Sequence, residues 1–360
     1  MSRVTFGPLA ANHIALWPLG THERTRIQAP AGPSRLGRRE GQGHSGSLTR
    51  CLAPVHSVCR SGGLAENADL QRIVVSKMNW RPVGLVDHGR LREARFEVHH
   101  AVQWLARAAR AYVPPQPDDS HSNFGWDDAF GGFTTHALAG DVRLGLKMID
   151  LALVVANREG DGSEAAFPLR GKADVDARGW LQAQLAARGL NPRGLDAPPP
   201  YGIPAHPIAE GAAYRVSEMA DALAELAAWF ANAHSSLGGI RDQMIAQGLT
   251  TSPVRCWPHH FDIATLISFD RVGNAGPARS VNVGLSPGDE YYDEPYFYVS
   301  PYPYPDAARL PHLPAIGHWH VQGFTAAITP ANRILGARNR QSETEAFLSD
   351  AVEASFKALS

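Results

Sequence analysis

Apolar residues recur every three or four positions in several segments after residue 78, and this spacing predicts amphipathic helices. The predicted helices are 91–112, 174–190, 216–230 and a C-terminal helix that begins at Ser342. In the last segment, Ser342 and Glu345 have the spacing of a capping box, which predicts Ser342 as the N-cap. In the first helix, we expect His100 to be half-buried and packed near Trp104.

Apolar and polar residues alternate in five further segments, which predicts β-strands. These segments are 142–157, 255–269, 280–286, 294–305 and 317–324. In 142–157 the apolar phase switches between Met148 and Ile149, which we interpret as a bulge or bend, although a buried helix is the alternative. Residues 115–132 are interpreted as a polar loop, and residues 191–207 as an extended Pro-rich connector at a candidate sub-boundary. The pattern predicts an α+β fold, with helices packed on a twisted, mostly antiparallel sheet.

The composition is that of an ordinary globular protein, with 360 residues, 44% hydrophobic residues and a net charge of −1. This balance gives no indication of nucleic-acid binding, and no apolar run approaches the ~20 residues of a transmembrane helix. Three cysteines without a CxxC motif argue against a disulfide scaffold or a cysteine zinc site. We therefore expect a cytoplasmic protein without a nucleic-acid or membrane partner.

The N-terminal segment differs from the rest of the chain. Residues 1–77 contain 10 Lys and Arg against 4 Asp and Glu, and they show no helical or strand periodicity. We expect this segment to be disordered, and to be either a basic arm or a translated upstream region with Met78 as the native start. Residues 78–360 are expected to form a single α+β domain.

Two adjacent histidines lie in the predicted strand 255–269. Because successive side chains of a strand point to opposite faces, the alternation places His259 with apolar residues. It places His260 beside Asp262 on the other, more polar face. His259 is therefore interpreted as structural, and His260 and Asp262 as ligand-binding candidates.

A second histidine pair lies in the predicted strand 317–324. The alternation places His318 and His320 on one face, so that both imidazoles can reach one metal ion. If His260 or Asp262 came from a neighbouring strand, the set would suit a divalent ion such as Zn, Fe or Mn. Further carboxylates are available nearby in the sequence, at Asp289, Glu290 and Glu294. The alternative is that these residues have structural roles only.

Six of the nine tyrosines lie in residues 291–305. Alternation places Tyr296, Tyr298, Tyr302 and Tyr304 on one face of the predicted strand. Such a face can stack on a sugar or a base, but tyrosine is also a common residue of half-buried strands. Tyr296, Tyr298 and the neighbouring Glu294 are therefore further ligand-binding candidates.

The chain lacks the short signatures of P-loop proteins, dinucleotide-binding proteins, HExxH metalloproteases and GxSxG hydrolases. From Met78 onward it resembles an uncharacterised bacterial family, a domain of unknown function. The resemblance lies in "VRLGLKMIDLALVV", "WPHHFDIA", "SPGDEYYDEPYFYVSPYPYP" and "GHWHVQGF". It implies no reaction, so no catalytic residue can be transferred from it.

Three functions therefore remain open. The first is a binding protein with a polar small-molecule pocket lined by histidine, aspartate and tyrosine. The second is a metal-dependent enzyme in which a metal-bound water is the nucleophile or the acid–base group. The third is a structural or partner-binding protein without a small-molecule site.

Overall fold

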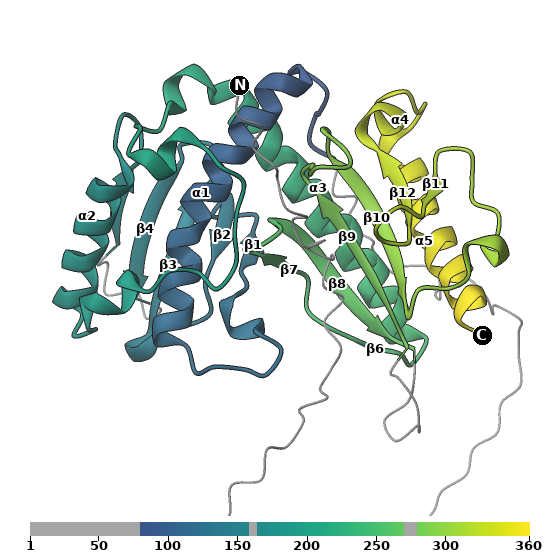
Figure 1. Cartoon of the computed structure of the whole chain (residues 1–360), viewed down its shortest axis with the longest axis horizontal. Helices are drawn as coiled ribbons and strands as arrows, with labels where there is room; N and C mark the ends of the chain where they lie inside the picture. Colours follow the sequence, from purple (N-terminus) through teal and green to yellow (C-terminus); the bar gives the residue numbers. More distant parts are fainter. Residues whose placement is uncertain (1–79, 158–163, 270–278) are drawn as a thin grey trace, which may run out of the picture. The chain divides into compact units, whose positions relative to one another are not determined.

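The computed structural model describes residues 80–157, 164–269 and 279–360. These residues form five α-helices and two antiparallel sheets (Figure 1). The α+β class predicted from the sequence is confirmed, but the strands form two sheets where one was expected. The predictions for residues 1–77 and for a start at Met78 lie outside the described residues. Within the described part, no helix has the length and apolar character needed to cross a membrane.

Four of the helices correspond to predicted ones. The bounds are α1 (His88–Tyr112), α2 (Asp174–Ala187), α3 (Ala220–Ala246), α4 (Ala331–Leu335) and α5 (Arg340–Leu359). Helix α3 continues well past the predicted end at residue 230, because Leu237, Ile240 and Met244 extend its buried stripe. Packing of this stripe outweighs the low helix propensity of Gly238 and Gly239.

The start of α5 differs from the prediction. Asn339 is the N-cap, because its Oδ1 accepts a hydrogen bond from Ser342 N at 3.1 Å. Glu343 Oε1 accepts one from Asn339 N at 3.0 Å. The predicted capping box of Ser342 and Glu345 is therefore wrong by three residues. Asparagine caps helices as well as serine does, so the sequence offered two starts of similar quality.

The first sheet, called the small sheet, is a meander of five strands in chain order. Its strands are β1 (Gly125–Asp127), β2 (Gly132–Thr134), β3 (Val142–Lys147), β4 (Ala152–Asn157) and β5 (Ala165–Pro168). The segment 142–157 is a hairpin, not a bent strand, because the chain reverses between β3 and β4 with Leu151 at φ 43°. The predicted loop 115–132 likewise contains β1, where Trp126 is buried.

The second sheet, called the large sheet, has seven strands. They are β6 (Thr250–Thr251), β7 (Arg255–Trp257), β8 (Asp262–Ser268), β9 (Ser280–Ser286), β10 (Tyr296–Tyr302), β11 (His318–His320) and β12 (Ala326–Pro330). The order is β11-β12-β10-β9-β8-β6, and β7 pairs with the other end of β8. Helices α3 and α5 pack on one face of this sheet, while α1 and α2 pack against the small sheet (Figure 1).

A short backbone contact joins the two sheets. Phe124 and Cys256 form an antiparallel bridge, with N–H···O distances of 3.0 and 2.9 Å. One continuous apolar core extends from α1 and the small sheet to α3, α5 and the large sheet. The strand β7 therefore lies at the junction of the two sheets, and the chain that follows it is held by both.

Candidate functional site

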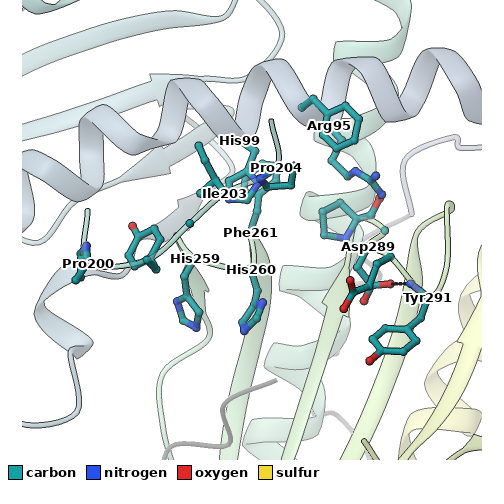
Figure 2. A pocket seen from close by; sticks show the side chains of 16 residues that line it. Arg95, His99, Pro200, Ile203, Pro204, His259, His260, Phe261, Asp289 and Tyr291 are labelled. Carbon is teal, nitrogen blue, oxygen red and sulfur yellow. Dashed lines mark hydrogen bonds between the residues drawn. The ribbon is translucent and has the colours of Figure 1, made fainter. Parts of the chain in front are cut away.

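A cavity of about 740 Å³ opens among four segments that are distant in sequence. Its volume lies within the usual range for small-molecule sites. The segments are the N-terminal half of α1, residues 200–204 of the connector, the turn 258–261 and the loop 287–291 (Figure 2). The polar and aromatic lining residues are Arg95, Phe96, His99, Tyr201, His259, His260, Phe261, Asp289, Glu290 and Tyr291.

The predicted strand 255–269 is two strands joined by a tight turn, and the turn contains both histidines. We call residues 258–261 the histidine turn. Phe261 closes it, with its N–H donating to Trp257 O at 2.8 Å and its φ at 59°. The assignment of His259 and His260 to opposite strand faces is therefore wrong. Their rings lie 4.4 Å apart between centroids and both line the cavity (Figure 2).

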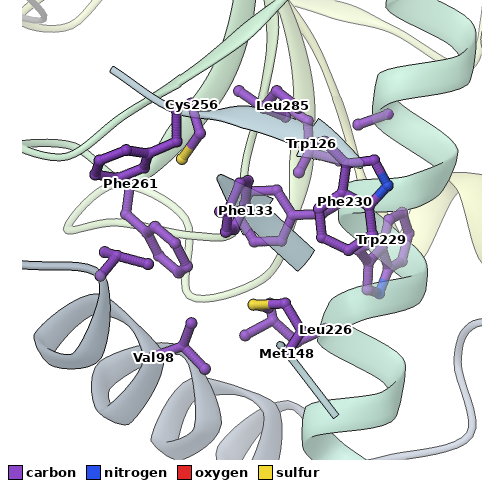
Figure 3. Close-up of a cluster of buried hydrophobic side chains, with 14 of the residues drawn as sticks. Val98, Trp126, Phe133, Met148, Leu226, Trp229, Phe230, Cys256, Phe261 and Leu285 are labelled. Atoms are coloured by element: carbon purple, nitrogen blue, oxygen red, sulfur yellow. The ribbon is translucent and has the colours of Figure 1, made fainter. Parts of the chain in front are cut away.

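The histidine turn is fixed on both sides. Phe261 is 1% exposed, and its ring lies 5.0 Å from that of Phe230 in the core (Figure 3). On the cavity side, Pro258 O accepts hydrogen bonds from His99 Nε2 and Gln103 Nε2, both at 2.9 Å. The backbone around the two cavity histidines is thus anchored to the core and to α1.

Burial keeps two imidazoles of the cavity in their neutral form. Desolvation lowers the pKa of His99 to about 3, and it lowers the pKa of His259 to about 3. At pH 7 both rings are uncharged, because burial penalises the imidazolium. Since His99 Nε2 donates to a carbonyl, its Nδ1 remains a hydrogen-bond acceptor.

Asp262 lies directly behind the cavity at the start of β8 and is 8% exposed. Its Oδ2 accepts a hydrogen bond from Tyr298 Oη at 2.5 Å, while its Oδ1 accepts none from any other described residue. Burial raises the pKa of this carboxyl group, and the charge of His260 acts in the opposite direction. The structure therefore places Asp262 near His260, as the sequence suggested, but outside the cavity surface.

The loop 287–291 is held against α1 by Arg95, which is 6% exposed. Arg95 Nη2 lies 3.6 Å from Asp293 Oδ1, and an ideal Cβ on Gly288 would lie only 1.9 Å from Arg95 Nη1. Gly288 also has φ 115°, a conformation that favours glycine. Asp289 then forms the turn itself, because its Oδ1 accepts hydrogen bonds from Tyr291 N and Tyr292 N at 2.8 and 3.0 Å.

The second histidine pair lies elsewhere on the large sheet. His318 and His320 are on the edge strand β11, which is separated from β8 by three strands. Their rings converge as predicted, but on Tyr292 Oη, at 2.9 Å from His318 Nε2 and 3.1 Å from His320 Nδ1. The structure therefore does not bring this pair together with His260 or Asp262, the further metal ligands that the sequence suggested. In the part of the chain that is described, no group of three or more His, Cys, Asp or Glu side chains is placed to hold a metal ion.

Two of the four tyrosines on the predicted face, Tyr296 and Tyr298, are covered, whereas Tyr304 is 38% exposed. Tyr296 and Tyr298 are buried and pack with Phe324 and Ile328 in a small cluster. Their hydroxyl groups donate to Asp289 and Asp262, both at 2.5 Å. Tyr296 and Tyr298 therefore stand behind the site as hydrogen-bond donors.

Glu294 also lies outside the cavity. Its Oε2 accepts a hydrogen bond from Asn332 N at 2.7 Å, at the first turn of α4. Glu290, in contrast, is exposed and lines the cavity. Of the three carboxylates considered as further ligands, Asp289 and Glu290 thus belong to the cavity, and Glu294 has a structural contact.

Sequence reasoning missed Arg95, His99 and Tyr201, and it interpreted the cavity residue His259 as structural. Arg95 and His99 lie one helical turn apart on α1, and Tyr201 comes from the connector. Tyr201 Oη donates to Gln103 Oε1 at 3.0 Å. On this helix the sequence analysis had singled out His100 instead. His100 is buried, and its Nε2 lies 3.0 Å from Pro204 O. The i, i+4 spacing of Arg95 and His99 on a helix was the available signal.

Comparisons with models of known protein families, with curated proteins and with solved structures find no match for this chain.

Proposed function

We propose that the cavity binds a small organic molecule that is rich in hydrogen-bond donors, such as an amine or a polyol. The observation that carries this proposal is the excess of acceptors in the lining. His99 and His259 are neutral at pH 7, and Asp289 and Glu290 add carboxylates. Among the described lining residues Arg95 is the one lysine or arginine, and it is already engaged with Asp293 and with Pro287 O. An anionic ligand would therefore meet carboxylates with little free positive charge to offset them.

The apolar part of the lining supports the same proposal. Phe96, Tyr201, Phe261 and several prolines give flat, rigid surface for carbon atoms. Polar acceptors on a mostly apolar wall are the usual arrangement in sites for small polar molecules, because a few directed bonds fix the orientation of the ligand. Polyols and small amines carry several donors on a compact carbon skeleton, which suits this lining.

The test is a ligand-observed NMR screen of the full chain against amines, polyols and, as the opposite class, carboxylates. We expect saturable binding of an amine or polyol, weakened by about tenfold in His260→Ala and in Glu290→Gln, which corresponds to ~1.4 kcal/mol. His312→Ala is the matched control, because His312 is exposed and does not line the cavity. Binding of carboxylates alone, or of none of the three classes, contradicts the proposal.

A second candidate function is acid–base catalysis in the same cavity. The observation that favours it is the buried Asp262 carboxyl group with one unused oxygen, adjacent to His260. A carboxylate behind an imidazole orients the ring and stabilises its protonated form during proton transfer. If this holds, Asp262→Asn abolishes turnover of a bound amine or polyol, followed by NMR of the product, while the ligand still binds. Equal turnover in the variant rules out this role.

For the metal-dependent alternative, the suggested ligands that converge on one point are His318 and His320. These two nitrogen atoms already hydrogen-bond Tyr292, so a metal ion would have to displace that hydroxyl group. Elemental analysis of the purified chain beside His318→Ala/His320→Ala tests it, and stoichiometric metal in the wild type alone supports it.

A further inference from the structure

Two arginines lie near each other beside the junction of the two sheets, and neither of them lines the cavity. We call Arg143 and Arg255 the arginine pair. Arg255 is on β7, and the antiparallel bridge of Phe124 with Cys256 places it opposite Gly125 of β1. Gly125 is opposite Thr134 of β2, and Thr134 is opposite Gly145 of β3. Arg143 precedes Gly145 by two residues and so shares its face.

Small residues make room for the guanidinium groups. An ideal Cβ on Gly125 would lie 2.6 Å from Arg255 Nη1 and 4.0 Å from Thr134 Oγ1. The Arg255 guanidinium therefore lies directly over the Gly125 backbone, with a hydroxyl donor on the far side. Arg143 is anchored by a single hydrogen bond, from Nη1 to Thr135 O at 3.0 Å. Glycine at position 125 therefore leaves space for the Arg255 guanidinium group, with the Thr134 hydroxyl group close by.

The charges in this site are not compensated by the described residues. Neither member of the arginine pair has a carboxylate within salt-bridge distance among the residues described, and the Arg255 side chain has no hydrogen bond to any of those residues. Burial and the charge of Arg143 both lower the pKa of Arg255. Arg95 provides the contrast, because Asp293 and Asp289 counteract the effect of burial on its pKa.

Two histidines stand beside the pair and are also affected by it. Burial lowers the pKa of His136, and the charges of Arg255 and Arg143 lower it further. Burial lowers the pKa of His234 as well, where Asp128 acts against Arg255. Half-buried like charges without a counter-ion are unfavourable, and an oxyanion that bridges them removes the repulsion.

We propose that the arginine pair binds a phosphate group, with Thr134 as an additional donor. Two planar guanidinium groups match the charge of a phosphate dianion and can each donate two parallel N–H bonds to its oxygens. None of these residues lines the cavity, so this site is separate from the proposed amine or polyol site. The group would come either from inorganic phosphate or from a small phosphate ester.

The test is a calorimetric titration of the full chain with inorganic phosphate at constant ionic strength. We expect saturable binding to the wild type, weakened at least about tenfold in Arg255→Gln and in Arg143→Gln, because each removes a charge-assisted contact. Arg178→Gln is the matched control, because Arg178 is an exposed arginine whose partner Asp196 lies elsewhere. A control that weakens as much as the pair variants, or a wild type that shows no saturable binding, overturns the proposal.

Two further measurements refine the proposal. The first asks whether space above Gly125 is needed in addition to the two charges, and the second compares inorganic phosphate with a phosphate ester. Gly125→Ala keeps both arginines but places a methyl group against Arg255 Nη1, so it should weaken phosphate binding without loss of charge. Unchanged affinity in Gly125→Ala contradicts the placement of the phosphate over this glycine. Repeating the titration with glycerol phosphate identifies the source. Tighter binding of the ester indicates a phosphorylated small molecule, and equal binding indicates that phosphate alone is recognised.

Discussion

The pairs His259–His260 and His318–His320 both lie in segments that were predicted to be strands. Their hydrogen bonds in the structure are very different. His318 and His320 lie on the edge strand β11, and Tyr292 Oη hydrogen-bonds to both of them. His320 Nε2 is also bonded, to Gln322 O at 2.6 Å. His259 and His260 lie in a turn, line a cavity and have no hydrogen bond to a described side chain or backbone group.

The difference shows that a favourable spacing is not sufficient for a binding site. The His-x-His spacing on β11 brings two imidazoles to one point, but a tyrosine from the neighbouring loop already occupies that point. The adjacent pair gains its significance from the turn, which leaves both rings free beside a cavity. A histidine can bind a ligand only through a ring nitrogen that has no partner within the protein.

The largest expected difference concerns the stability contributed by the residues next to each histidine pair. Phe261→Ala removes a fully buried ring next to Phe230 and Phe133 and should lower the free energy of unfolding by about 3–5 kcal/mol. Val321→Ala, beside the second pair, should change it by less than about 0.5 kcal/mol, because Val321 is 48% exposed. Urea denaturation measures both values, and similar losses in the two variants contradict the contrast in anchoring.

The next effect is the acid sensitivity of the cavity. The pKa of His99 is about 3 in the folded chain and near the ordinary 6.5 when unfolded, so the unfolded state binds the extra proton. Stability from this group is complete above pH 6.5 and declines as the pH falls toward 3. The decline should be about 1.4 kcal/mol per pH unit, while the raised pKa of Asp262 acts in the opposite direction.

Denaturation curves between pH 6 and pH 4 measure this decline. His99→Gln keeps a donor for Pro258 O but does not titrate, so its slope should be shallower than that of the wild type by about 1.4 kcal/mol per pH unit. His312→Ala, at an exposed position, should leave the slope unchanged. Identical slopes for His99→Gln and the wild type indicate that His99 is protonated in the folded chain.

The smallest expected effect is the difference in stability between two variants that each remove a tyrosine hydroxyl group, one near each histidine pair. Tyr298→Phe leaves the buried Asp262 without its hydrogen bond and should cost about 1–3 kcal/mol. Tyr292→Phe should cost less than about 1 kcal/mol, because water can replace the hydroxyl group at the partly exposed His318 and His320. A larger loss for Tyr292→Phe reverses the order and makes the second pair the more strongly structural one.

Periodicity predicted most elements of the fold, and it failed where the chain reverses without a glycine. The hairpins β3–β4 and β7–β8 were both interpreted as single strands. The turns contain Leu151 and Phe261, which adopt positive φ values of 43° and 59°. Bulky residues rarely adopt this conformation, so neither residue marked its turn. The phase switch at Met148 and Ile149 lies in the first turn, but it was interpreted as a bulge or bend. Packing holds both residues there, since each is almost completely buried.

The candidate site was predicted in part. His260 and Asp262 were identified, and they lie beside each other, but for a different reason than the strand alternation that suggested it. Arg95, His99 and Tyr201 could not be assigned, because they come from a helix and a connector whose positions relative to the turn depend on the packed core. Tyr296, Tyr298 and Glu294 were chosen for their chemistry, and burial and hydrogen bonding removed them from the cavity surface.

The sequence by itself determined the α+β class, the principal helices and most of the strands, because these follow from local periodicity and the burial of one face. Tertiary structure alone decided which polar groups are free. Each histidine, tyrosine and carboxylate has the same chemistry wherever it lies, but its charge and availability depend on burial and on partners far along the chain. The same principle applies to the arginine pair, which has no carboxylate within salt-bridge distance among the described residues.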